Sequence, residues 1–333
     1  INAILRGVYI HDNPLNTNSK GAFAEVKNTT IAAPAGIVID GADTGGNIHN
    51  NTVNATTMGI GVSSSVVSAV NALNIADNNV TLANQLASGT PTVGVILGNV
   101  SGSAAATLAG NDISDAFYGY SIYDVNTNPA TSITGGEITG VMQGLAIVNV
   151  NPVNPSVMAP STVNVEGITM DEFAGAHPSM SAINFHAGIY VYTAGTNAAD
   201  KVTATIDNVS VTATGKISQD SAGMSFADFS TGAGTRQQIT VANSNITGNF
   251  NRGINARGSN AMIEIANSDV VDNGFDSFGV SNHGYGIIGR VGAVLSIHGN
   301  HIANPATFTN TVTVIGSDNA NITAYENKIW NHG

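Results

Sequence analysis

Two arginines and an aspartate occupy nearly the same place in three successive segments of the sequence. Each segment begins with a glycine and alternates apolar residues: GMSFAD ends at Asp228, GINAR at Arg257 and GIIGR at Arg290. An arginine flanked by acids and a histidine can bind a uronate or assist proton abstraction in a lyase-type reaction. A row of surface ion pairs is the alternative interpretation. The candidate ligand-binding residues are Asp228, Arg252, Arg257, Asp272, Asp276, His283 and Arg290.

The sequence predicts no catalytic set around these residues. The second position after each segment-opening glycine is expected to face outward, and its occupants include Tyr9, Ser121, Tyr190 and Asn255. Hydrolysis of a glycoside by general acid and base needs two carboxyl groups, and no such pair occurs at this position. The tyrosines at 120, 123, 190 and 192 are on the same type of segment and are a possible stacking platform for sugars.

No metal or cofactor site is predicted either. His298 and His301 are three residues apart, but no third ligand is evident. Calcium stays open as an alternative, through Asp40 with Asp43 or through the two candidate aspartates after residue 270. The spacing of a calcium-binding loop or nonapeptide repeat is absent.

The charge distribution excludes nucleic acid as a partner. The net charge is −12, with only 10 lysines and arginines in 333 residues, whereas phosphate binding requires clustered cations. No lysine or arginine lies between Lys27 and Lys201, which also argues against a groove for a long polyanion. The chain has no run of 18 apolar residues that would span a membrane as a helix, and no cysteine, which fits an oxidising exterior without disulfides.

The elements that would position the candidates are repeated along the whole chain. Two apolar residues five positions apart, with Asn, Asp, Gly, Ser or Thr between them, recur at a mean spacing of about 30 residues. Val241 and Ile246 around ANSN are an example. The eleven pairs are Val26/Ile31, Ile48/Val53, Ile75/Val80, Leu108/Ile113, Ile133/Ile138, Val163/Ile168, Ile206/Val211, Val241/Ile246, Ile265/Val270, Ile297/Ile302 and Ala324/Ile329.

A glycine followed by alternating apolar residues precedes most pairs, as in GIVID from Gly36 and GIYVY from Gly188. This period of two indicates a strand with one buried face. Because one unit cannot bury its apolar face alone, we expect the units to stack as coils, with polar corner residues bonding to their counterparts one coil away. The sequence therefore predicts an all-β fold: one right-handed parallel β-helix of about eleven coils over residues 1–333.

These repeats resemble the pattern GIxV…ITIxNNxIxxN of right-handed parallel β-helix proteins in the pectate-lyase-like superfamily. The resemblance covers nearly the whole chain and implies the fold, but its members include polysaccharide lyases and hydrolases, phage tailspikes and bacterial adhesins. The composition, poor in lysine and rich in Thr, Gly and Ala, is most similar to a bacterial autotransporter passenger or surface adhesin.

We therefore expect an extracellular rod, a piece of a longer bacterial surface protein, with a structural and adhesive role. Its partner would be a glycan or protein of a host, a matrix or another cell, bound at a neutral face or at the long loops 151–160, 171–186 and 193–200. Two alternatives stay open: a lyase or hydrolase acting on acidic glycans, and a subunit that assembles with copies of itself into a layer or filament.

Overall fold

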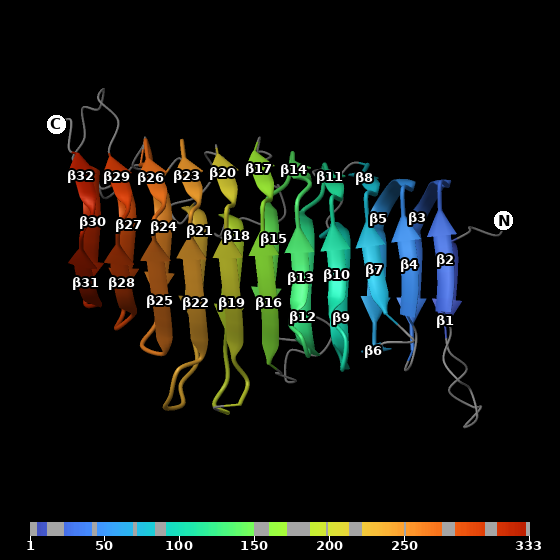
Figure 1. Cartoon of the computed structure of the whole chain (residues 1–333), viewed down its shortest axis with the longest axis horizontal. Helices are drawn as coiled ribbons and strands as arrows, with labels where there is room; N and C mark the ends of the chain where they lie inside the picture. Colours follow the sequence, from blue (N-terminus) through green and yellow to red (C-terminus); the bar gives the residue numbers. More distant parts are fainter. Residues whose placement is uncertain are drawn as a thin grey trace.

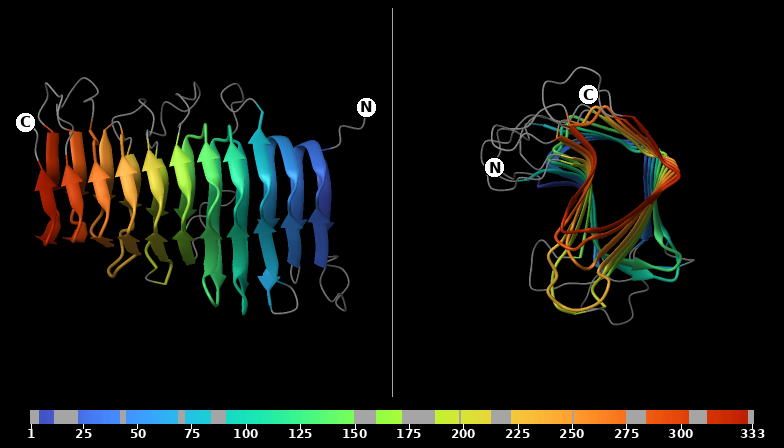
Figure 2. Two further views of the ribbon diagram at one scale, coloured as in Figure 1. Left: turned by 45° about the horizontal axis from the view of Figure 1, so that its top comes forward. Right: turned by 90° about the vertical axis from the view of Figure 1, so that its left-hand side faces the viewer.

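The computed structural model confirms the predicted architecture: within its described residues every regular element is a strand. It describes residues 5–11, 23–41, 45–68, 72–83, 91–149, 160–171, 187–197, 199–212, 222–249, 251–274, 284–303 and 312–330. The strands wind into a right-handed rod with three walls, and each coil adds one strand to each wall (Figures 1 and 2).

The long wall carries the glycine-led strands. Its members are β1 Arg6–His11, β3 Thr30–Asp40, β5 Thr52–Ser63, β9 Val93–Gly102, β12 Tyr118–Thr127, β15 Gln143–Val148, β18 Ala187–Thr193, β21 Ala222–Asp228, β24 Arg252–Arg257, β27 Gly284–Arg290 and β30 Val312–Asp318.

The middle wall is a separate parallel sheet of eleven strands. These are β2 Phe23–Lys27, β4 Gly45–His49, β7 Leu73–Ala76, β10 Ala106–Ala109, β13 Thr131–Thr134, β16 Ser161–Glu166, β19 Val202–Asp207, β22 Gln237–Ala242, β25 Ala261–Ala266, β28 Val294–His298 and β31 Asn321–Tyr325.

The short wall completes each coil, and the first residues of β3 and β5 serve as its first two strands. The others are β8 Asn79–Leu82, β11 Asp112–Ser114, β14 Glu137–Thr139, β17 Thr169–Asp171, β20 Ser210–Thr212, β23 Asn245–Thr247, β26 Asp269–Val271, β29 His301–Ala303 and β32 Lys328–Trp330; the two-residue β6 Val66–Val67 pairs with the end of β9.

The predicted apolar pairs form two columns, which are buried in the core along the rod and become exposed at Ala324 and Ile329 in the last coil. Val241 and Ile246 are fully buried on either side of their corner, and each is in register with its counterpart on neighbouring coils. One pair was predicted wrongly. The residues in register are Val165 and Met170, not Val163 and Ile168, because the corner of that coil is at Gly167, with φ 67°.

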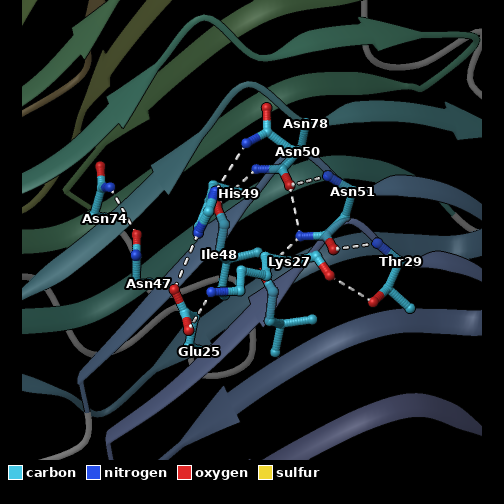
Figure 3. Close-up of polar contacts among 11 residues, drawn as sticks. Glu25, Lys27, Thr29, Asn47, Ile48, His49, Asn50, Asn51, Asn74 and Asn78 are labelled. Atoms are coloured by element: carbon cyan, nitrogen blue, oxygen red, sulfur yellow. Dashed lines mark hydrogen bonds and ion pairs between the residues drawn. The ribbon is translucent and has the colours of Figure 1, made fainter.

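The corner between the middle and short walls is built from a left-handed residue followed by a small or polar one. Asn50, Asp77 and Asn243 have φ of 55°, 54° and 50°, values that Asn and Asp tolerate better than most residues. The next residue forms a ladder along the rod: the Asn51 N–H and side-chain amide both donate to Asn78 Oδ1, at 3.1 and 2.9 Å (Figure 3). This confirms the predicted asparagine ladder.

The recurrent glycine of the long wall has a packing cause. A Cβ on Gly59 would lie 2.5 Å from the carbonyl oxygen of Gly94 on the next coil and would also collide with Val80. The same carbonyl approach recurs at the other glycines of this column, and Val314 replaces glycine in the last described coil. The glycines therefore permit the coils to stack at the β spacing of about 4.8 Å.

The columns together make a rod, as predicted. In Figure 1 the strands succeed one another along the long axis from β1 to β32. Among the described residues, no helix is long and apolar enough to cross a membrane.

Candidate functional site

The outward residues of the long wall form straight columns along the rod. One column brings Arg257 and Arg290 onto adjacent coils, with Ala227 before them and Asp318 after them. In chain order the column is His11, Asp40, Ser63, Gly98, Tyr123, Val148, Tyr192, Ala227, Arg257, Arg290 and Asp318.

Arg257 lies against an aromatic side chain. Its guanidinium carbon is 5.0 Å from the centre of the Phe229 ring, within the range of a cation–π contact. The Phe229 ring in turn lies 5.7 Å from that of Tyr192, and Tyr192 lies 6.1 Å from Tyr190. We call Tyr190, Tyr192, Phe229, Arg257 and Arg290 the aromatic–arginine row.

Arg290 differs from Arg257 in its charge environment. Its Nε is 3.5 Å from Asp318 Oδ2 on the next coil, so a carboxylate partly balances its charge. Across the described parts of the chain, no carboxylate forms an ion pair with Arg257. The two arginines are therefore neighbours in different environments. The guanidinium of Arg257 is more available than that of Arg290 to pair with a carboxylate of a ligand.

Asp228 does not join this row. It comes one residue after Ala227, on the other side of the strand pleat, and is only 4% exposed. Its carboxylate accepts hydrogen bonds from the Thr193 hydroxyl at 2.8 Å, from the backbone N–H of Asn260 at 3.1 Å and from Ser230. These bonds tie the segment after β21 to the neighbouring coils, so Asp228 has a structural role.

The other candidates are dispersed. Arg252 is buried at the start of β24, five residues before Arg257. Asp272 is the left-handed residue, with φ 54°, at the corner between the short and long walls. Asp276 and His283 lie outside the described residues.

The tyrosine platform is shorter than predicted. Tyr120 points into the core and is fully buried, whereas Tyr190 and Tyr192 belong to outward columns. Burial raises the pKa of Tyr190 and Tyr192, and the Asp228 carboxylate adds to the rise at Tyr192. Both hydroxyls therefore stay protonated at neutral pH and act as donors and stacking surfaces, not as bases.

No convergent metal site is evident in the described ranges, where no three His, Asp or Glu residues gather. His298 faces Glu264 at 3.0 Å on the middle wall, and His301 faces Asp269 at 3.2 Å on the short wall. Asp40 accepts a hydrogen bond from Ser63 at 2.7 Å, and Asp43 lies outside the described residues. Calcium binding stays a prediction.

Sequence reasoning missed Phe229 and Asp318. Phe229 comes directly after the end of β21, so the alternating strand pattern does not include it. Its contact with Arg257 joins residues 28 positions apart. Asp318 belongs to the one coil whose segment lacks the opening glycine, so counting from glycine did not align it with Arg290.

An open hollow of about 380 Å³ lies on a different wall. It is on the outer face of the middle wall, with Thr240, Met262, Glu264, Val294 and Thr323 among its lining residues. Met262 and Val294 are 48% and 38% exposed, so two apolar side chains of its lining are open to solvent.

No family model matches this sequence, and no curated protein matches it. Among solved structures, the chain is similar to the A-module of the mannuronan C-5 epimerase AlgE4 of Azotobacter vinelandii. The identity is 13%, the match covers 94% of this chain and 91% of that chain, and the TM-score is 0.31. The fold rests on the strand pairing described above, and a likeness this distant adds nothing about function.

Proposed function

We propose that the chain is an extracellular binding rod of a bacterial surface protein that attaches to a short stretch of acidic glycan through its aromatic–arginine row. The observation that carries the proposal is Arg257, a cation held against Phe229, whose ring also contacts that of Tyr192 on the outer wall. Aromatic rings with a few convergent polar groups are typical of small-ligand sites.

The arginine supplies the selectivity for acid. A guanidinium presents several donors in one plane and pairs with a carboxylate through two parallel bonds. Because Phe229 supports Arg257 from one side, less side-chain entropy is lost when a ligand binds. A uronate carboxylate at Arg257 would place the adjoining sugar rings along the column toward Tyr192 or Arg290.

The ligand is short because the row is short. Tyr192 and Arg290 are three coils apart, or about 14 Å at the β spacing. The coils between Lys27 and Lys201 offer no cation to a polyanion that continues along the rod. An oligosaccharide with one or two carboxylates fits this charge distribution better than a long polymer does.

Attachment is favoured over turnover by the chemistry of the row. In the described part of the column, the outward carboxylate next to the row is Asp318, which is engaged with Arg290, and Asp228 is buried in structural hydrogen bonds. Acid–base hydrolysis needs two carboxyl groups at the sugar. The polar corner residues form hydrogen bonds between coils, and the resulting stack suits a stiff extracellular spacer.

Calorimetric titration with oligouronates and with neutral oligosaccharides of equal length tests the proposal. We expect preference for the oligouronate and a loss of about tenfold or more in affinity for Arg257→Gln, since a charge-assisted bond contributes about 1.5–3 kcal/mol. Arg6→Gln is the matched control: Arg6 lies 4.0 Å from the Tyr9 ring on the same wall, at the far end of the rod.

Equal affinity for neutral sugars, or an unchanged affinity in Arg257→Gln, would contradict acid-glycan binding. Unsaturated or epimerised products appearing during the titration, and absent with Arg257→Gln, would establish the enzymatic alternative. The surface location is tested separately, by protease treatment of intact source cells. A rod that is digested only after the cells are lysed would contradict a surface location.

A further inference from the structure

The outer face of the middle wall combines an exposed aromatic side chain at one end with a hollow at the other. Phe23, on β2, is 55% exposed. It occupies the same outward column as Met262 and Val294, which lie on β25 and β28 and line the hollow. Figure 1 shows β2 and β28 near opposite ends of this wall, nine coils apart along the row of strands.

The stretch between these ends is uncharged along its central column and carries small side chains. Asn47 and Asn74 are joined by a hydrogen bond of 2.8 Å, and Ser132, Asn164 and Thr205 continue their column. Small polar residues repeated in register can interdigitate with those of a second flat sheet at a separation of about 10 Å.

We propose that this wall is a self-complementary interface, at which two copies of the chain pack face to face with their rods antiparallel. A two-fold axis parallel to the strands, between β13 and β16, reverses the order of the coils and keeps each column opposite itself. Phe23 of each copy then lies over Val294 and Met262 of the other, which fills both hollows by the same contact.

The charges of the wall are compatible with this arrangement. Under the same axis, Glu166 on β16 faces Thr134, Asp207 on β19 faces Ala109, and Glu264 on β25 faces Asn47. Glu25 on β2 likewise faces Ser296, so these four carboxylates oppose neutral residues and not one another. A two-fold axis along the rod, with each coil opposite itself, would instead place Glu264 of the central column opposite its own copy, which costs free energy.

The outer face of the middle wall is also large enough for a stable dimer interface. Ten opposed strands at about 4.8 Å, each presenting about five residues of 3.3 Å, give roughly 800 Å² per copy, the size of a standard stable interface. The long wall is a separate face of the rod (Figure 2), so the dimer leaves both aromatic–arginine rows open. Two rows on one particle would bind clustered glycans with higher avidity than one.

Sedimentation velocity and small-angle scattering of the 333-residue chain test the interface. We expect a dimer that is thicker than the single rod and of nearly the same length. Phe23→Ser should raise the dimer dissociation constant by about tenfold or more. Leu5→Ser is the matched control, since Leu5 is 69% exposed in the first coil but precedes a strand of the long wall. Thermal melts of both variants show whether each is folded.

The orientation is tested with cysteines, because the natural chain has none. Under the proposed axis, Ser132 on β13 faces Asn164 on β16, so a mixture of Ser132→Cys and Asn164→Cys proteins should form a mixed disulfide under mild oxidation. A mixture of Ser132→Cys and Thr323→Cys should not, since Thr323 is on β31. A chain that stays monomeric, a dimer that doubles in length, an unchanged dissociation constant in Phe23→Ser, or cross-linking through Thr323 would each overturn the proposal.

Discussion

Replacing Asn78 by alanine would remove one rung of the corner ladder and measure what the ladder contributes. The Asn78 side chain is buried, and its amide donates to the Ile48 carbonyl at 2.9 Å and to Asn111 Oδ1 at 2.9 Å. Its oxygen accepts two bonds from Asn51, at 3.1 and 2.9 Å. These four bonds link three successive coils.

The expected cost follows from the groups that would lose a partner. Asn111 Oδ1 keeps its bond from the Asn78 backbone N–H, and the Asn51 amide keeps its bond to the Val26 carbonyl. The Asn51 backbone N–H loses its partner, whereas the Ile48 carbonyl loses one bond and keeps its place in the β4–β7 ladder. Leaving a buried polar group unsatisfied costs about 1–3 kcal/mol and losing a hydrogen bond about 0.5–1.5 kcal/mol, so we expect Asn78→Ala to destabilise the coil by roughly 2–4 kcal/mol.

Serine is the matched control because the chain itself uses serine at this position. Ser244 Oγ accepts from the Val209 N–H at 3.2 Å and donates to the Ala242 carbonyl at 2.7 Å. Asn78→Ser would therefore keep an acceptor for the Asn51 N–H and lose the amide bonds to the Ile48 carbonyl and to Asn111 Oδ1. Its cost should be roughly 1–3 kcal/mol, clearly below that of alanine.

Native-state hydrogen exchange is the suitable assay, since a stacked repeat need not unfold in one step. A loss of 2 kcal/mol or more should speed exchange of protected amides in the coil of Ile48 and Val53 by about thirtyfold or more. Amides near Ile297 should be unaffected, because each coil contacts only its neighbours. If alanine and serine gave equal exchange rates, or if alanine matched the natural chain, the ladder would not stabilise the fold as reasoned here.

Two further substitutions test separate parts of the structure. Gly59→Ala should destabilise the rod by about 1–3 kcal/mol, because the added Cβ meets Gly94 and Val80. An unchanged melting temperature would contradict the packing argument. Asp228→Asn should lower the melting temperature, since the buried carboxylate accepts hydrogen bonds from Thr193, Ser230 and Asn260. The affinity for an oligouronate should stay within twofold. A large loss of affinity without loss of stability would show that Asp228 belongs to the binding row.

The sequence alone determined the fold because its signals are local and repeated. A period of two marks a strand, a left-handed Asn, Asp or Gly marks a corner, and a recurrent glycine marks a close approach between coils. Any one of these signals is weak, but stacking requires every coil to satisfy the same geometry. The one misassigned pair, Val163 and Ile168, arose because two overlapping pairs share the spacing of five and only the strand register separates them.

The tertiary structure decided the composition of the candidate site. Counting from a glycine cannot separate the fourth from the fifth position reliably, yet one residue reverses the pleat: Arg257 faces outward, while Asp228 turns into a buried corner. The contacts of Arg257 with Phe229 and of Arg290 with Asp318 join residues 28 positions apart. Such contacts depend on how the coils align in space, and no local pattern along the chain encodes that alignment.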